Sequence, residues 1–212
     1  KKFKNIVNIK AEFTKLFKRC RGALLALYII EVCVSVSIIG FIFILPEVIA
    51  AKNYEQYWQH GGAHMLYVLG SSLIIIPAGH YSDKTSQKMV IFLSLIGSIA
   101  LFYIFLVFPK MHLALFIPLM ITLGGAMGIC NPVGVALGNR LVPGQVSLVS
   151  ALLMGFAWGV ASFASFLVGY LSKKFDDPVK ALYFLGISMF IALILIIFIP
   201  GRQKVHEFES VI

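Results

Sequence analysis

Long apolar segments separated by short polar ones dominate the chain. A helix needs about 20 mainly apolar residues to cross a bilayer. Six segments reach or nearly reach that length, at residues 23–45, 61–78, 89–108, 113–137, 149–171 and 181–199. The second is the weakest, because it is short and contains His64, Gly70, Ser71, Ser72 and Pro77. Barrel strands would be shorter and would alternate, so the pattern predicts an all-α membrane protein with six transmembrane helices.

Composition supports the same fold class. The 212 residues are 59% hydrophobic and 13% charged, and their mean hydropathy is +0.92. Soluble domains contain about 25% charged residues, so this chain has too little charge to cover a water-exposed surface. We therefore expect a multi-pass integral membrane protein with the lipid bilayer as its surroundings.

The positive charge is unevenly placed. Of the 18 Lys and Arg residues, eight lie in the first 21 positions. If both termini are cytoplasmic, the cytoplasmic side carries 13 of these residues and the outside carries 5. Cytoplasmic loops are enriched in Lys and Arg, so we expect both termini to be cytoplasmic. Topology and anionic headgroups explain the basic balance, and no nucleic-acid partner is expected.

These features divide the chain into three parts. Residues 1–22 form a basic cytoplasmic linker, residues 23–200 form the six-helix bundle, and residues 201–212 form a short cytoplasmic tail. Within the linker, apolar residues occur at roughly helical spacing between lysines. Such a segment is either an amphipathic helix on the membrane surface or a partly ordered connector.

A short polar stretch, GHYSDKTSQK, lies between the second and third apolar segments at residues 79–88. We expect it to close a tight turn in which Gly79 lets helices approach closely. Asp83 can accept hydrogen bonds from helix N-terminal amides, and Lys84 and Lys88 favour the cytoplasmic side. The alternative is an ordinary polar loop.

The same stretch resembles the loop signature of the major facilitator superfamily, G-x-x-x-D-[RK]-x-G-[RK]-[RK]. Gly79, Asp83, Lys84 and Lys88 match it, whereas Ser86 and Gln87 depart from it. The resemblance implies one six-helix half of a twelve-helix bundle, in which the four matching residues belong to a cytoplasmic gate loop. Residues 1–21 then resemble the basic connector between halves, so the chain is expected to be the C-terminal half, with the N-terminal half as its partner.

Residues 139–176 resemble the fosmidomycin-resistance-like branch of that superfamily. Pro143, Gly144, Ser150, Gly155 and Gly159 match its pattern, although Ala151 replaces a glycine. The resemblance implies a transporter of a bacterial plasma (inner) membrane that works as a proton-coupled antiporter. It would export a small molecule or drug and so contribute to drug resistance.

Glu31 is the most unusual single residue, because it lies inside the first apolar segment. Ionisable residues within membrane spans are costly and are often functional. Such a carboxyl can bind and release a proton, so Glu31 is our proton-coupling candidate. A purely structural, hydrogen-bonded glutamate is the alternative.

Small and helix-bending residues mark further positions. Glycines spaced four apart favour close helix packing; they are Gly124, Gly128, Gly134, Gly138, Gly155 and Gly159. Asn131 and Pro132 are expected to interrupt the fourth span with a kink and a free carbonyl. Ser162 and Ser165 in the fifth span either bond across helices or line a cavity.

Other function classes have less support. No apolar segment contains HExxH, paired aspartates or a Ser/His arrangement, so we expect no enzyme, no metal site and no cofactor. A non-transporting membrane component, such as an assembly factor or sensor, remains open. So does an inactive fragment of a split transporter gene.

Overall fold

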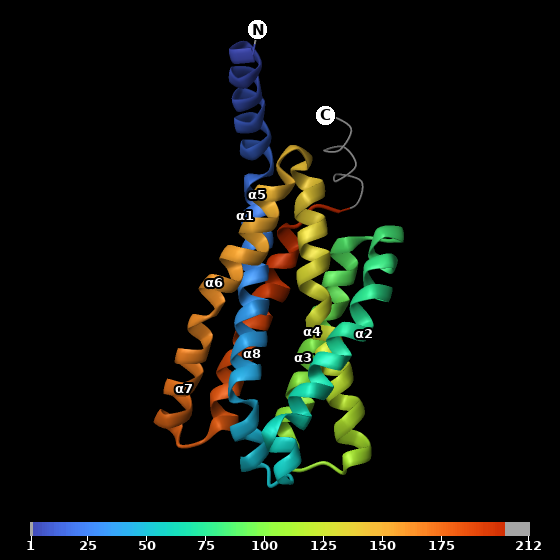
Figure 1. The fold of residues 1–212 in the computed structure, drawn as a ribbon, viewed down its shortest axis with the longest axis vertical. Coiled ribbons are helices and arrows are strands. Elements are labelled where there is room, and N and C mark those ends of the chain that lie inside the picture. Colours follow the sequence, from blue (N-terminus) through green and yellow to red (C-terminus); the bar gives the residue numbers. More distant parts are fainter. Residues whose placement is uncertain (1, 202–212) are drawn as a thin grey trace.

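The computed structural model describes the backbone of residues 2–201 and the side chains of residues 22–201 (Figure 1). The expected tail at 202–212 lies outside the described residues. Within them the chain is helical, without strands. Its α-helices are α1 (Lys2–Ala51), α2 (Ala63–Lys84), α3 (Gln87–Val107), α4 (Leu113–Leu141), α5 (Val146–Ser150), α6 (Ala157–Ala161), α7 (Phe163–Phe175) and α8 (Pro178–Leu195). Wider π-helical turns occupy Trp58–Gly62 and Ala151–Phe156, and 3₁₀ turns occupy Pro143–Gln145 and Ile196–Phe198.

Six helical segments of the described chain are long and apolar enough to span a membrane. They are Gly22–Ala51, Trp58–Lys84, Gln87–Val107, Leu113–Leu141, Pro143–Phe175 and Pro178–Phe198. The predicted all-α membrane protein with six transmembrane helices is therefore confirmed. The fifth span is assembled from α5, the π-helical turn, α6 and α7, and is called the fifth span below.

Several predicted boundaries differ from the structure. The second span continues beyond residue 78 to Lys84, because Pro77 and the polar residues that follow it are accommodated within the helix. The first helix has no break near residue 22, since α1 runs from Lys2 through the first span to Ala51. In Figure 1 the first part of α1 extends beyond the other helices.

The spans run up and down with short connections. Residues 85–86 join α2 to α3, and Asp176 and Asp177 join α7 to α8. Asp177 caps α8 by accepting hydrogen bonds from the amides of Val179 and Lys180, at 2.8 and 3.3 Å. We call the end where α1 enters the bundle the entry end; it includes residues 85–86, 142–145 and the end of α8. The opposite end is called the far end (Figure 1).

Aromatic rings fill the centre of the bundle. Phe41 of α1 is fully buried, and its ring lies 5.4 to 5.7 Å from the rings of Tyr67, Phe102 and Phe105. Tilted and edge-to-face arrangements at such distances are favourable. Phe41 therefore joins α1 to α2 and α3.

Helices α2 and α4 cross closely because glycines replace side chains at their contact. A Cβ atom on Gly70 would meet the backbone carbonyl of Ile121, and one on Gly124 would meet that of Tyr67. A backbone cannot move aside as a side chain can. The α2–α4 contact therefore requires glycine at both positions.

The fifth span differs from the others in its regularity. Its buried positions recur at intervals of four and once three; they are Val149, Leu153, Ala157, Ala161, Ala164, Val168 and Ser172. A wider π-helical turn keeps residues four apart nearly in line. The irregular backbone thus aligns one narrow stripe of mostly small residues with the bundle.

Candidate functional site

Glu31 lies on the side of α1 that faces α4, and its side chain is only 1% exposed. A Cβ atom built on Gly134 of α4 would meet Oε1 of Glu31, and would lie 2.9 Å from Cδ. Real Cβ atoms essentially never come closer than 3.0 Å to another heavy atom. The Glu31 carboxyl therefore occupies the space that a side chain at position 134 would need.

Two further polar residues share this contact. Leu27, one turn before Glu31, lies against Gly138, one turn after Gly134. This antiparallel register brings Ser35, one turn after Glu31, to the level of Asn131. Both Ser35 and Asn131 are buried. We call Glu31, Ser35 and Asn131 the α1–α4 polar seam.

The α1–α4 polar seam contains unsatisfied oxygens. Glu31 Oε2, Ser35 Oγ and Asn131 Oδ1 are buried and lack hydrogen-bond partners among the described residues. A buried polar group without a partner costs about 1–3 kcal/mol, and a charged one costs more. Groups left in this state deserve a functional explanation.

Helix α4 is continuous through Asn131 and Pro132 to Leu141, and the expected kink stays a prediction. The helix accommodates the proline, whose missing amide removes the usual hydrogen bond to the carbonyl of Gly128. Asn131 and Pro132 therefore lie in a continuous helix that is weakened at the level of the polar seam.

The stretch 79–88 is mostly helical. Gly79 to Lys84 belong to the last turns of α2, and only Thr85 and Ser86 lie outside the helices. The close approach expected at Gly79 is wrong, because no described atom lies within 4 Å of a Cβ built there.

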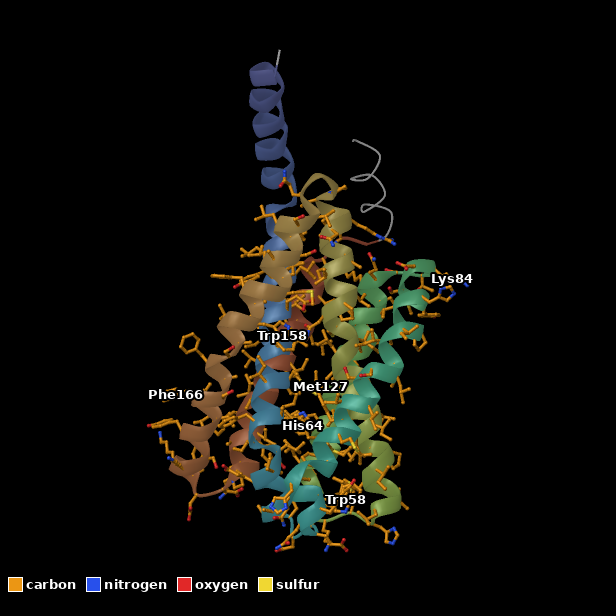
Figure 2. All side chains as sticks on the ribbon, in the orientation of Figure 1. Trp58, His64, Lys84, Met127, Trp158 and Phe166 are labelled. Atoms are coloured by element: carbon orange, nitrogen blue, oxygen red, sulfur yellow. The ribbon has the colours of Figure 1, made fainter. Side chains whose placement is uncertain are left out.

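Two charged residues of this stretch contact other helices at the entry end. Asp83 accepts a hydrogen bond from the guanidinium of Arg140 at 2.9 Å, rather than from helix amides as expected. Lys88 donates to the carbonyls of Ile197 and Ile199 at 3.3 and 2.6 Å, beyond the last turn of α8. Lys84 lies at the end of α2 (Figure 2).

The far end is closed around a buried lysine. Lys52 donates hydrogen bonds to the carbonyls of Leu106 and Phe108, which end α3. Its Nζ also lies 5.2 Å from the centre of the Phe105 ring, a favourable cation–π distance. Burial lowers the pKa of Lys52, and the nearby Asp177 carboxylate partly offsets this shift.

Tyr54 adds a second connection at the far end. Its hydroxyl accepts a hydrogen bond from the Met111 amide at 2.8 Å, and its ring stacks 4.5 Å from that of Phe116. Burial raises the pKa of Tyr54, while the bond from Met111 acts in the opposite direction. The connections between the spans are thus fixed at this end by buried polar contacts.

The six predicted packing glycines fall into two groups. Gly124, Gly128, Gly134 and Gly138 of α4 face atoms of α1, α2 or the fifth span at contact distance, as expected of packing positions. No described atom approaches a Cβ built on Gly155 or Gly159, so a packing role for these two stays a prediction.

The described contacts of the two fifth-span serines do not decide between their two expected roles. The Ser162 hydroxyl donates to the carbonyl of Trp158 in its own helix at 2.9 Å, and both roles stay predictions. Ser165 is half-buried. Figure 2 shows Phe166 of the same span pointing away from the bundle.

Some residues of these contacts were missed from sequence. Lys52 and Arg140 entered the sequence argument only as charges that set topology, and Ser35 did not enter it. Their partners lie far away along the chain, such as Asp83 for Arg140.

Comparison with known families identifies the chain. The model of the Major Facilitator Superfamily matches residues 27–210, which is most of the chain. Comparison with curated proteins gives no match. The family match agrees with the six spans and with the position of the 79–88 stretch across the end of the second and the start of the third. The chain therefore belongs to the Major Facilitator Superfamily, a family of membrane transporters.

Proposed function

We propose that the chain is the C-terminal half of a twelve-helix transporter of the fosmidomycin-resistance-like branch. It pairs with an N-terminal six-helix half and works by alternating access. Substrate sites in such transporters lie between the repeats near the membrane midplane. The transported compound is a small molecule or drug, exported from the cell in exchange for protons.

The uneven burial of the spans carries this proposal. Within its most apolar window, the first span is 61% buried, whereas α2 with its preceding turn and the fifth span are each only 28% buried. The three other spans lie at 39–44%. Two spans of six are therefore mostly uncovered by the rest of the described chain. A second half that packs on both of them would complete the bundle.

The uncovered face of the fifth span is suited to a helix rather than to lipid. Gly155, Gly159 and Ser162 are exposed at intervals of four and three residues. Small residues at such spacing let a neighbouring helix approach closely in membranes, and the space in front of both glycines is open. Phe166, on the same face two turns after Gly159, is 78% exposed.

Contacts between helices favour movement of the six spans as one body. At the entry end, Asp83 joins α2 to α4 and Lys88 joins α3 to the end of α8. At the far end, Lys52 joins α1 to α3. Alternating access by rocking requires such rigid units.

The distribution of Lys and Arg favours one orientation in the membrane. With the entry end in the cytoplasm, 13 of the 18 Lys and Arg residues lie inside, as the positive-inside rule favours. The gate loop residues Gly79, Asp83, Lys84 and Lys88 are then cytoplasmic, and the Asp83–Arg140 ion pair forms part of the gate. Glu31 binds the coupling proton.

Transport in proteoliposomes tests the proposal. The chain is co-expressed with the N-terminal half of its gene, and flux of candidate drugs is measured under an imposed pH gradient. We expect flux from the pair and none from this chain alone. Glu31→Gln should abolish proton-driven flux without affecting assembly. Glu47→Gln, at the exposed end of the same span, is the matched control and should retain flux.

Two results would contradict different parts of the proposal. Full flux from this chain alone would overturn its assignment as a half. Unchanged proton-driven flux in Glu31→Gln would overturn the coupling role of that residue.

A further inference from the structure

The α1–α4 polar seam contains three unsatisfied oxygens, and Gly134 leaves room for the carboxyl that carries one of them. Glu31 Oε2, Ser35 Oγ and Asn131 Oδ1 lack partners among the described side chains and backbone. Glu31 and Ser35 come from α1, and Asn131 comes from α4 beside Pro132. The coincidence of these features at one helix contact calls for a common explanation.

We propose that Glu31, Ser35 and Asn131 form one proton-binding site, in which Gly134 is the positioning residue for the Glu31 carboxyl. The role of this site in coupling rests on the proposed function. The site itself is a property of the α1–α4 contact.

The chemistry of the three groups favours a proton as the ligand. An ionised carboxylate and an amide oxygen are both acceptors only, so without a donor they leave each other unsatisfied. A proton on Glu31 supplies an O–H donor, for which Asn131 Oδ1 at the same level of the bundle is an unpaired acceptor. The Ser35 hydroxyl both donates and accepts, so it can complete the chain of hydrogen bonds.

A metal cation fits these groups less well. Hard cations such as Ca²⁺ take six to eight oxygen ligands. The polar seam offers two carboxyl oxygens, one hydroxyl and one amide oxygen. A proton needs a single acceptor, and the site provides several.

Other titratable groups are few at this level of the bundle. On α4, Cys130 interacts electrostatically with Glu31, and its sulfur lies 3.3 Å from Ser94 Oγ. Arg140 of α4 lies at the entry end, with Asp83. The titratable groups of α7 and α8 lie towards the far end; they are Tyr170, Lys173, Lys174, Lys180 and Tyr183. His64 and Tyr67 lie in the first turns of α2, also towards the far end.

Gly134 positions the Glu31 carboxyl by leaving room for it rather than by bonding to it. Any side chain at 134 would overlap Oε1 and Cδ of Glu31, so the carboxyl would have to move from its present position. The missing amide of Pro132 lets α4 adjust at the same level. A change in the protonation of Glu31 and a change in the local shape of α4 can therefore affect each other at this contact.

Infrared difference spectroscopy of the paired transporter in lipid measures the site directly. The wild type should show a carboxylic-acid C=O band that titrates with pH and disappears in Glu31→Gln. Gly134→Ala should lose or displace this band and lower proton-driven flux roughly tenfold or more. Gly97→Ala on α3, where a Cβ would lie 3.9 Å from the Cβ of Ala126, is the matched control and should leave the band unchanged.

A compensating change guards against simple misfolding. Glu31→Asp shortens the side chain by one methylene and withdraws the carboxyl from position 134. The double variant Gly134→Ala with Glu31→Asp should therefore recover folding and a titrating band. Ser35→Ala and Asn131→Leu should each displace the band, because each removes one hydrogen-bond partner of the carboxyl.

Each contrary outcome has a distinct meaning. The inference is wrong if Gly134→Ala behaves like Gly97→Ala. It is also wrong if the double variant folds no better than Gly134→Ala, or if the band responds to Na⁺ instead of pH. A band that titrates normally while flux ignores the pH gradient would support the site and overturn proton coupling in the proposed function.

Discussion

Helix α4 and the fifth span contain the same small-residue pattern but use it differently. The glycines of α4 contact Glu31, Ser71, the Tyr67 backbone and a leucine pair, whereas Gly155 and Gly159 face open space. Helix α4 therefore has its packing partners within this chain. The fifth span has a similar surface without a partner among the described residues, which indicates where a further helix would bind.

The largest effect is expected where a glycine faces backbone. Gly124→Leu should destabilise the six-helix unit by about 3 kcal/mol or more, because the added side chain overlaps the Tyr67 carbonyl and overpacks the core. Thermal unfolding in detergent measures the loss. A stable Gly124→Leu variant would show that the α2–α4 crossing is not as close as described.

A smaller loss is expected at the buried lysine that joins α1 to α3. Lys52→Met removes two hydrogen bonds at the end of α3, and we expect a loss of about 1–2 kcal/mol. Since burial lowers the folded-state pKa of Lys52, the unfolded chain binds more protons between that pKa and 10.5. The contribution of Lys52 to stability therefore increases as pH rises through that range.

Unfolding temperatures of wild type and Lys52→Met, measured from neutral to alkaline pH, test this sign. The difference between the two proteins should grow as pH increases. Tyr54 acts oppositely, since its raised pKa makes stability fall at alkaline pH, but it is present in both proteins. A difference that shrinks with rising pH would contradict the burial of Lys52.

Substitution of a glycine that faces open space should weaken association with the N-terminal half without lowering the stability of this chain. Gly155→Leu should change the stability of this chain by no more than about 0.5 kcal/mol. It should weaken pairing with the N-terminal half by about tenfold or more, which corresponds to about 1.4 kcal/mol. Co-purification of the two halves measures pairing, with Leu148→Ile on the same span as the control. Equal pairing by both variants would remove this face from the interface.

A similarly small change in stability is expected at the exposed ion pair. Asp83→Asn removes the charge opposite Arg140, and exposed pairs contribute about 0–1 kcal/mol. We nevertheless expect slower turnover, because the pair joins α2 and α4 at the proposed gate. Normal turnover at normal stability would leave the Asp83–Arg140 contact without a gating role.

Sequence alone identified the six spans because apolar length is a property of each segment by itself. It missed the extent of α2, since Pro77, His80 and Asp83 suggest a loop although the helix continues through them. The π-helical turn in the fifth span was also missed, because a spacing of four is compatible with an ordinary helix.

The candidate site was only partly predictable for a similar reason. Glu31 stands out locally as a carboxyl in an apolar segment. Its neighbour Gly134 is distant along the chain, and the glycine pattern does not reveal whether the opposite surface is a carboxyl, a backbone or open space. Only the register between α1 and α4 brings Ser35 and Asn131 to the same level.

The central claim is that the uncovered faces of α2 and the fifth span bind a second six-helix half. A photoreactive phenylalanine analogue at Phe166, which is 78% exposed, tests it in the membrane. The same analogue at Ile194 of α8, which is 63% exposed, serves as the lipid-facing control. The account predicts a protein cross-link to the N-terminal half from position 166 and lipid adducts from position 194. Lipid adducts alone from both positions would contradict it.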